Sequence, residues 1–358
     1  MSDISQQLIE QVNSARSDGR KLNIIGRGSK SFYGRTATGD HFNVAEHNGI
    51  VNYHPAELVL TARAGTSIAE LEAALDKEGQ MLSFEPSNFG SEASIGGTLA
   101  CNLSGPSRPW GSSVRDMVLG LRLINGRGEH LRFGGQVMKN VAGYDVARVQ
   151  AGAMGCLGAI TEISLKVLPK PAAVATAVLP LDSAHEAIAV MNDFSRDPAP
   201  MMGACWLEGQ LYIRYSGAGN AVDSAINRLI QQYGEANVLS GDVTFWRELR
   251  EQSLAFFAGD RPLWRFSVAS TLNHFMPEAD WLIDWGGAQR WLRGDFKQEE
   301  LQWQVESGNG QVSLFRHGNR DGEVFFEHSE AIKTLHHRLK ASFDPDFVFN
   351  PGRLYRWL

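Results

Sequence analysis

Helical and extended hydrophobic patterns alternate in the amino-terminal part of the chain. Apolar residues recur at helical spacing over 4–15, which predicts a helix, and a short apolar run at 22–25 predicts a strand. That strand leads directly into a glycine-rich turn at 26–29. A further apolar run at 59–62 predicts a second strand. The mixture of helix and strand patterns indicates a fold that contains both.

Cap and turn residues mark the next elements. Ser67 and Glu70 have the spacing of a capping box, which predicts the start of a helix that Gly79 closes. Two runs with strand-like alternation, 118–124 and 130–133, flank an Asn-Gly turn. This combination predicts a β-hairpin.

Two prolines mark a candidate domain boundary. A strand predicted at 159–167 ends just before Pro169 and Pro171, and the pattern changes beyond them. The elements predicted next are a strand at 173–179, a helix at 183–194, paired strands at 203–207 and 211–215, and a helix at 220–233. This β-α-β-β-α order predicts a ferredoxin-like α+β unit. The later pattern predicts a helix near 244–257, strands near 263–269 and 281–284, and a helix near 330–340.

Length and composition are those of an ordinary globular chain. At roughly 150 residues per domain, the 358 residues correspond to about two domains. A content of 43% hydrophobic and 21% charged residues excludes a disordered chain. No apolar run approaches the ~18 residues needed to cross a bilayer, and the polar start lacks the features of a secretory signal. We therefore expect a cytoplasmic protein without a membrane span.

Charge, cysteine and histidine content exclude several kinds of partner. Lys and Arg total 34 against 40 Asp and Glu, a net charge of −6, so the chain lacks an electrostatic footprint for nucleic acid. Cys101, Cys156 and Cys205 are far apart and form no Cys-x-x-Cys, which predicts reduced thiols and no iron–sulfur cluster. His336 and His337 are adjacent on a predicted helix and project about 100° apart. We interpret them as surface residues and expect no metal site.

The turn at 26–29 is the first of three glycine clusters. Successive backbone N–H groups after a strand can surround an anion, so the turn is either a phosphate site or a structural turn. It is not a Walker A loop, because Ser29 stands where the last glycine of that motif belongs. It is not a Rossmann fingerprint, because Ser31 replaces the third glycine.

The other two clusters are longer. The run from 94 to 105 has small side chains at nearly every step, so its backbone can lie against a planar ligand. The run from 141 to 160 places Gly152, Gly155 and Gly158 at a spacing of three and leads into a strand. Three such clusters within one domain are stronger evidence for a diphosphate site than any one of them.

Together these segments resemble a known family. The motifs that carry the resemblance are Gly26-Arg27-Gly28-Ser29, Ser94-Ile95-Gly96-Gly97, Gly111-Ser112-Ser113-Val114-Arg115-Asp116, the block 139–145, Gly152-x-x-Gly155-x-x-Gly158 and Asn350-Pro351-Gly352. In type and order they are similar to the vanillyl-alcohol-oxidase (PCMH) type of FAD-binding domain. With the run 105–109 and the short chain, they most resemble the FAD-binding E subunits of glycolate oxidase. The resemblance is strong over about 20–170 and looser beyond.

The resemblance implies a fold and a domain plan. The fold class is α+β, with a two-subdomain PCMH-type FAD-binding domain followed by a smaller ferredoxin-like α+β cap. The expected domains are the FAD-binding domain at 1–170, a cap for substrate or partner at 171–342, and a tail at 343–358 that returns to the FAD domain.

The resemblance also implies a cofactor and its contacts. Backbone amides around 27–29, together with Gly96 and Gly97, are expected to hold the FAD diphosphate, while Tyr144 and Asp145 close over the cofactor. The cofactor-binding residues that the resemblance implies are Gly26, Arg27, Gly28, Ser29, Pro86, Ser94, Ile95, Gly96, Gly97, Ala100, Asn102, Gly105, Gly111, Arg115, Asp116, Gly143, Tyr144, Asp145, Gly152, Gly158, Ile160 and Asn350. The segment 31–34 lacks the histidine or cysteine of relatives with covalent flavin, so FAD is expected to be noncovalent.

Oxidation of a 2-hydroxy acid by a flavin needs a cation for the carboxylate and a base for the hydroxyl proton. Arg265 lies in an apolar run that predicts a cap strand, where its guanidinium can bind a carboxylate through two hydrogen bonds or form a structural ion pair. Arg316 and His317 follow another predicted strand and place a cation beside a candidate base. These three are the candidate catalytic residues.

Three functions stay open at this point. The resemblance favours the FAD-binding subunit of a glycolate (2-hydroxyacid) dehydrogenase complex, which oxidises glycolate to glyoxylate and passes electrons through FAD to an iron–sulfur partner. It implies a larger homologous FAD subunit and an iron–sulfur subunit as partners, which hold the chain at the cytoplasmic side of the inner membrane. The alternatives are a self-sufficient D-2-hydroxyacid (D-lactate) dehydrogenase and a non-catalytic scaffold that has lost flavin.

Overall fold

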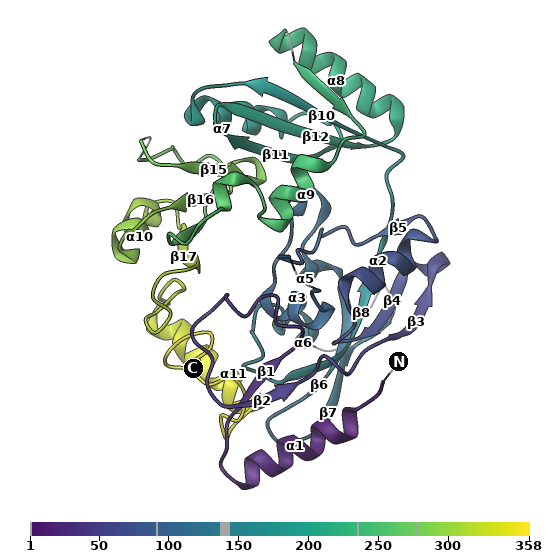
Figure 1. The fold of residues 1–358 in the computed structure, drawn as a ribbon, viewed down its shortest axis with the longest axis vertical. Coiled ribbons are helices and arrows are strands. Elements are labelled where there is room, and N and C mark those ends of the chain that lie inside the picture. The colour runs from purple at the N-terminus through teal and green to yellow at the C-terminus, as the bar shows by residue number, and fades with distance from the viewer. Residues whose placement is uncertain (1, 91, 137–143, 235, 277) are drawn as a thin grey trace. The chain divides into compact units, whose positions relative to one another are not determined.

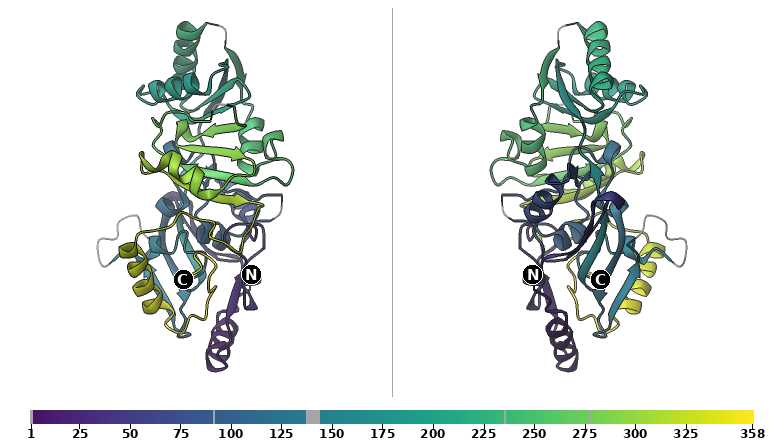
Figure 2. Two further views of the ribbon diagram at one scale, coloured as in Figure 1. Left: turned by 90° about the vertical axis from the view of Figure 1, so that its left-hand side faces the viewer. Right: turned by 90° about the vertical axis from the view of Figure 1, so that its right-hand side faces the viewer.

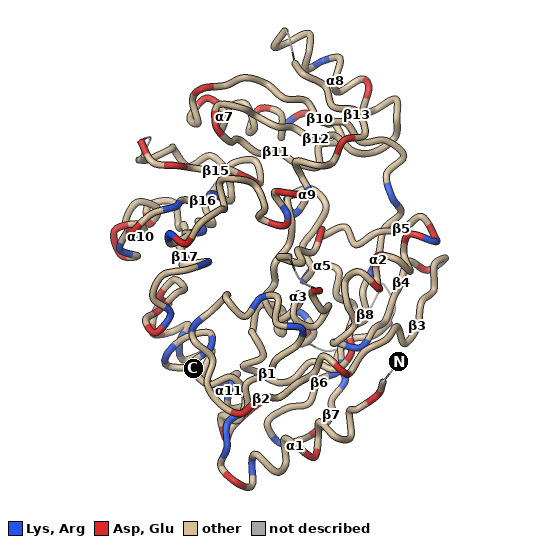
Figure 3. Tube along the Cα trace, in the orientation of Figure 1, with Lys and Arg blue, Asp and Glu red and all other residues tan. Residues whose placement is uncertain are grey.

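The chain divides between two folding units, each made of more than one stretch of sequence (Figure 1). A computed structural model describes residues 2–90, 92–136, 144–234, 236–276 and 278–358. Unit 1 comprises Met1–Ser104, Ser113–Pro169 and Asn319–Leu358, and unit 2 comprises Gly105–Ser112 and Lys170–Gly318. Lys and Arg are interspersed with Asp and Glu along both units (Figure 3).

A five-stranded antiparallel sheet forms the centre of unit 1. Its strands, in sheet order, are β3 (Ile50–His54), β4 (Val59–Arg63), β8 (Ala159–Lys166), β6 (Val118–Ile124) and β7 (His130–Gly134). The helices of this part are α2 (Ile68–Asp76), α3 (Ile95–Cys101), α5 (Val114–Met117) and α6 (Val146–Val149), and η1 (Pro55–Glu57) is a short 3₁₀ turn. Leu60, Leu121 and Ile163 of the sheet pack with Leu71 and Leu99 of the helices in one buried core.

Local sequence signals explain the best-defined elements of this sheet layer. The Ser67 side chain accepts a hydrogen bond from the Glu70 backbone N–H, which caps α2 as expected. Strands β6 and β7 pair across the Asn-Gly turn, which confirms the predicted hairpin. Both predictions were correct because each depends on residues close together in sequence.

The first and last parts of the chain meet in a second layer of unit 1. Helix α1 (Ser5–Ser17) packs with the parallel pair β1 (Leu22–Ile25) and β2 (Asp40–Asn43) (Figure 2). The carboxy-terminal segment after α11 (Glu330–Phe343) lies along β1, since the Leu22 N–H donates to Val348 O. Two short strands, β5 (Gln80–Met81) and β9 (Leu168–Pro169), also pair.

Unit 2 is built on an eight-stranded antiparallel sheet. Its strands, in sheet order, are β13 (Asn237–Ser240), β10 (Ala173–Pro180), β12 (Gln210–Gly217), β11 (Met201–Leu207), β15 (Trp281–Asp284), β16 (Gln289–Arg293), β14 (Leu263–Ser267) and β17 (Gln311–Arg316). Its helices are α4 (Arg108–Gly111), α7 (Ala184–Phe194), α8 (Gly219–Tyr233), α9 (Thr244–Glu251) and α10 (Gln298–Glu306), with 3₁₀ turns η2 (Ala255–Phe257) and η3 (Trp285–Gly287).

The ferredoxin-like prediction describes one half of this sheet. Strands β10 to β13, with α7 and α8, have the order 4-1-3-2 that the β-α-β-β-α-β pattern produces. Helix α7 packs on β11, and α8 packs on β10 and β12 (Figure 2). The sheet then continues through β15, so the cap is larger than one ferredoxin-like unit. Within the residues that the structure describes, no helix is both long enough and apolar enough to cross a membrane.

Candidate functional site

The glycine turn at 26–29 follows β1 and presents unbonded backbone N–H groups. Gly28 has a φ of 78°, and a Cβ placed there would meet no atom within 4 Å. The turn is closed by the Ser31 N–H, which donates to Gly28 O at 3.1 Å. In the described part of the chain, the backbone N–H groups of Arg27, Gly28 and Ser29 donate to no acceptor. Successive free amides of this kind form an anion-binding concavity.

Two cations lie at this turn, Arg27 within it and Lys30 directly after it. Lys30 is buried, and its ammonium donates to Ser87 O at 2.9 Å and Ser29 Oγ at 3.3 Å. Arg27 donates from Nε to Gly65 O at 3.1 Å and forms an ion pair with Glu92. Lys30 was not among the predicted site residues, although its place directly after the turn was a signal available in the sequence. The turn is therefore next to two cations, of which Arg27 is paired with Glu92.

Most of the second glycine cluster forms the helix α3, which the sequence analysis did not predict. Ser94 caps α3 by accepting from the Gly97 N–H, and the Gly96 N–H donates to Ala64 O at 2.8 Å. A Cβ on Gly96 would lie 2.7 Å from the Ala64 Cβ. Gly96 thus lets α3 pack closely on the residue that follows β4, and the amides of Gly96 and Gly97 are bonded within the protein. A role for Ser94, Ile95, Gly96 and Gly97 at FAD stays a prediction.

The carboxy-terminal end of α3 meets the third glycine cluster. The Gly152 N–H donates to Leu99 O at 3.1 Å, and the Met154 N–H donates to Ala100 O at 2.9 Å. Asn102 ends the helix with a φ of 51°. Its Oδ1 is buried and has no hydrogen-bond partner among the described residues. Leaving such an acceptor unsatisfied costs about 1–3 kcal/mol, so the site suits a ligand that supplies a donor.

Asn350 joins this cluster to the strand before the glycine turn. Its Oδ1 accepts from the Ile24 N–H at 2.7 Å, and its Nδ2 donates to Met154 O at 2.6 Å. Its own backbone N–H donates to Leu22 O. Asn350 is therefore bonded to two predicted cofactor segments and positions both of them through protein contacts.

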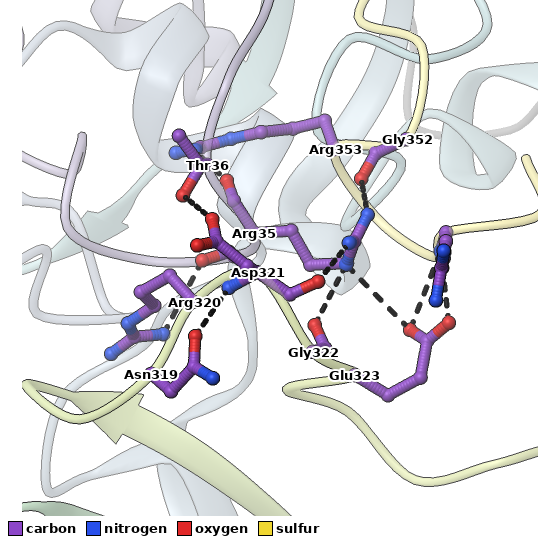
Figure 4. A network of polar contacts seen from close by, with 11 residues as sticks. Arg35, Thr36, Asn319, Arg320, Asp321, Gly322, Glu323, Gly352 and Arg353 are labelled. Carbon is purple, nitrogen blue, oxygen red and sulfur yellow. Dashed lines mark hydrogen bonds and ion pairs between the residues drawn. The ribbon is translucent and has the colours of Figure 1, made fainter.

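Arg353 holds the segment that follows the glycine turn (Figure 4). Its guanidinium donates to the carbonyl oxygens of Ser31, Tyr33 and Arg35. Arg35 in turn donates to Gly352 O at 2.8 Å. Burial lowers the pKa of Arg353 from its ordinary value. The carboxy-terminal segment thus fixes the exit of the glycine turn as well as its entry.

Several predicted contacts have local structural roles. The Asp116 carboxylate accepts from the Ser113 N–H at 3.2 Å and completes the capping box of α5. Asp145 is itself the N-cap of α6, and its Oδ1 accepts from the Arg148 N–H at 3.2 Å. Tyr144 is 96% exposed, so its side chain does not cover unit 1 in this structure. Arg115 is exposed.

The remaining predicted residues occupy varied positions. Gly158 has a φ of 154°, and a Cβ there would lie 2.9 Å from Ile124 O. Ile160 is buried in the core of unit 1, and Pro86 is buried. Gly143 lies outside the described residues. Gly105 and Gly111 belong to the segment of unit 2 that contains α4.

Arg265 lies on β14 among aromatic rings of unit 2. Its Nε donates to Gln289 Oε1 at 2.7 Å. The guanidinium carbon is 5.2 Å from the centre of the Trp285 ring and 5.8 Å from that of Trp291. Its two terminal nitrogens donate to no acceptor among the described residues. This arrangement leaves a planar fork able to bind a carboxylate.

Arg316 and His317 lie at the end of β17. In the pairing of β14 with β17, Arg316 is opposite Leu263, two positions along the strand from Arg265. Burial lowers the pKa of Arg316. His317 follows with a φ of 61°. The structure thus places both arginines on neighbouring strands of one sheet.

The three cysteines are free thiols, and only one of the two adjacent histidines is exposed. Cys101, Cys156 and Cys205 are free, and burial raises the pKa of the Cys156 thiol to about 11. His337 is exposed as predicted, but His336 is half-buried against Trp357, with ring centres 5.8 Å apart. No group of His, Cys, Asp or Glu in the described ranges could hold a metal ion.

Comparison with known proteins identifies similar chains and folds. Residues 4–134 match the family described as FAD binding domain. The chain is 45% identical over 356 residues to glycolate oxidase subunit GlcE of Escherichia coli (strain K12), which covers 99% of this chain and 98% of that protein. It is 32% identical over 124 residues to glycolate oxidase subunit GlcD of Bacillus subtilis (strain 168), which covers 35% of this chain and 26% of that protein. The structure of p-cresol methylhydroxylase with substrate bound matches 99% of this chain and 87% of that chain, with a TM-score of 0.77 at 14% identity, which confirms the predicted fold.

Proposed function

The chain belongs to the family of glycolate oxidase subunit GlcE, and from this membership we propose that it is the FAD-binding subunit of a complex that oxidises glycolate or a similar 2-hydroxy acid. The observation that carries the proposal is the set of unbonded amides at 27–29 beside the buried ammonium of Lys30. Such a concavity binds a diphosphate without needing a base or a metal.

Different residues of unit 1 bind different parts of the dinucleotide. Amides of Arg27, Gly28 and Ser29 receive the diphosphate, and Lys30 neutralises part of its charge. The buried Asn102 Oδ1 accepts a hydrogen bond from the cofactor, which would satisfy its missing partner. Because no side chain in this set provides a covalent attachment, FAD is held noncovalently.

The residues of unit 2 receive the substrate. The free fork of Arg265 binds the carboxylate through two hydrogen bonds, and Arg316 on the neighbouring strand adds positive charge. His317 accepts the hydroxyl proton. Bound FAD supplies the acceptor for the two electrons that leave the carbon–hydrogen bond of the hydroxy acid.

The complex provides the route for electrons beyond this chain. The similar protein of Escherichia coli is named as a subunit of glycolate oxidase, and the partially similar GlcD is a second subunit of an enzyme of that name. We infer a larger homologous FAD subunit as partner, together with an iron–sulfur subunit, because three separated cysteines are too few to hold a cluster here. Attachment to the cytoplasmic side of the inner membrane then comes through these partners.

Dye reduction with glycolate tests the proposal. The purified chain and the co-expressed complex are each given glycolate or D-lactate, with an Arg265→Gln complex as the variant. We expect reduction by the complex, and a strong loss in the variant because the carboxylate loses its bidentate donor. Reduction by the isolated chain at the rate of the complex would instead support a self-sufficient dehydrogenase. A complex that keeps full activity when this chain holds no flavin would support the alternative of a non-catalytic scaffold.

A further inference from the structure

An unusual turn connects β15 to β16 in unit 2. Trp285, Gly286 and Gly287 have φ values of 53°, 64° and 99°, so three successive residues are left-handed. A Cβ on Gly287 would lie 2.7 Å from Ser270 O. Trp285 is 6% exposed, and its backbone N–H donates to the buried Asp284 carboxylate at 2.7 Å. A bulky residue in this conformation costs about 1–3 kcal/mol, and such strain concentrates at functional sites.

Two arginines lie against the Trp285 ring. The guanidinium carbon of Arg108 is 4.7 Å from the ring centre, and that of Arg265 is 5.2 Å from it. The indole N–H donates to Gly105 O at 3.1 Å, which anchors the segment that carries Arg108. One strained tryptophan ring therefore contacts two cations from distant parts of the sequence, both within unit 2.

A relay of hydrogen bonds orients one of these cations. Asp284 Oδ2 accepts from Gln289 Nε2 at 3.3 Å, and Gln289 Oε1 accepts from Arg265 Nε at 2.7 Å. The relay uses Nε and leaves the two terminal nitrogens of Arg265 for a ligand. Arg265 forms no ion pair within the ranges that the structure describes. The orientation of its guanidinium group is therefore fixed, and no carboxylate of the described residues neutralises its charge.

We propose that Arg108 and Arg265, gathered by Trp285, form a two-cation site for the carboxylate of a small 2-hydroxy or 2-oxo acid. Arg265 binds the carboxylate as a fork, and Arg108 binds the adjacent oxygen of the same molecule. Arg108 thereby favours ligands with two neighbouring oxygen groups over simple monocarboxylates. The ligand class rests on the proposed function, whereas the pair of cations rests on the contacts around Trp285.

Oxalate and acetate are the probes for this site, titrated into the purified full-length chain by calorimetry. We expect oxalate to bind at least tenfold more tightly than acetate. Arg265→Gln should weaken oxalate at least tenfold, and Arg108→Gln should weaken oxalate severalfold while leaving acetate nearly unchanged. Arg247→Gln removes an exposed arginine of α9 outside the cluster and serves as the matched control, which should bind as the original chain does.

The outcomes separate this site from the cofactor proposal. Equal oxalate affinity in Arg108→Gln and the original chain would overturn the two-cation site. So would an Arg108→Gln substitution that weakens oxalate and acetate by the same factor. Thermal melting of each variant, with Arg108→Lys as a charge-preserving substitute, identifies losses that come from unfolding. Flavin content is read from the absorbance of the same samples. If oxalate binding needs both arginines but the chain takes up no FAD, the two-cation site is supported and the proposed function is refuted.

Discussion

At Gly28, the effect of an alanine on backbone conformation can be separated from its effect on FAD binding by comparison with a second glycine. Gly28 and Gly79 have φ values of 78° and 62°, and a Cβ on either would meet no atom within 4 Å. An alanine in this conformation costs about 1–2 kcal/mol at either position. Only Gly28 lies among the unbonded amides of the proposed diphosphate site.

We therefore predict that Gly28→Ala and Gly79→Ala lower the free energy of unfolding by similar amounts, whereas only Gly28→Ala weakens FAD at least tenfold. The added methyl group occupies the open space at Gly28, next to the unbonded amides, and the strain of the left-handed conformation shifts the directions of these amides. Fluorescence titration of the apoprotein with FAD measures the affinity, and urea denaturation measures stability. Equal FAD affinity in the two variants would mean that the turn at 26–29 does not hold the cofactor.

His47 makes stability depend on pH. It is 3% exposed, its Nδ1 accepts from the Ile4 N–H at 3.2 Å, and burial lowers its pKa to about 4. Asp3 opposes this shift and Arg63 adds to it. Because the unfolded histidine, with a pKa of ~6.5, binds protons before the folded one does, stability falls as the pH is lowered between these two values.

We predict that acidification from about pH 7 to about pH 5 removes about 2 kcal/mol of stability through His47. In His47→Gln this component of the pH dependence should disappear, while His41→Gln, which changes an exposed histidine of β2, should keep it. Urea denaturation at both pH values measures the difference. An unchanged pH dependence in His47→Gln would contradict the assignment.

Residue roles were harder to predict than residue positions. Asp116 and Asp145 lie in motifs that resemble cofactor contacts, and each accepts a backbone hydrogen bond at the start of a short helix, so their role at FAD stays a prediction. Asn350 likewise is bonded to Ile24 and Met154. A motif indicates that a polar side chain is needed at a position. The hydrogen-bond partner of that side chain depends on tertiary contacts, which the linear sequence does not show.

At the scale of elements, α11 is tied to the rest of unit 1 by a buried ion pair. Lys340 and Asp344 are both fully buried, and the ammonium donates to Asp344 Oδ2 at 2.7 Å, to Cys156 O at 2.7 Å and to Phe349 O at 2.8 Å. Asp344 also accepts from the Phe349 N–H. The pair thus joins the helix, the third glycine cluster and the segment beside β1.

We predict that Lys340→Met destabilises the protein by about 3–5 kcal/mol, because it leaves a buried carboxylate without its cation. Lys333→Met on the same helix breaks ion pairs with the exposed carboxylates of Glu327 and Glu330 and should change stability little. Denaturant unfolding of both variants provides the comparison. A Lys340→Met protein as stable as Lys333→Met would show that the buried pair does not hold α11 in place.

Elements with local signals were predicted well, and those that depend on distant partners were not. Helix α2 and the β6–β7 hairpin carry their own cap and turn residues. Helix α3 was missed because its glycines disfavour a helix in isolation, and it is held by hydrogen bonds from the Ile95 and Gly96 N–H groups to Thr66 O and Ala64 O, just after β4. The extension of the cap sheet through β15 was also missed, since pairing of β11 with β15 joins segments far apart in sequence.

At the scale of the molecule, each unit contains one half of the proposed chemistry. Unit 1 has the amides, the ammonium and the orphan acceptor that suit a dinucleotide, and unit 2 has the arginine fork that suits a carboxylate. The segment Gly105–Ser112 belongs to unit 2 although it follows α3 of unit 1 in sequence. The functional labels of the domains expected at 1–170, 171–342 and 343–358 stay predictions.

The visible absorption spectrum of the purified chain tests the central claim most directly. The account predicts the flavin bands at about one FAD per chain, and release of that FAD into the supernatant when the protein is precipitated with acid, because it is held without a covalent bond. A chain that stays colourless after incubation with excess FAD and removal of the unbound cofactor would contradict it.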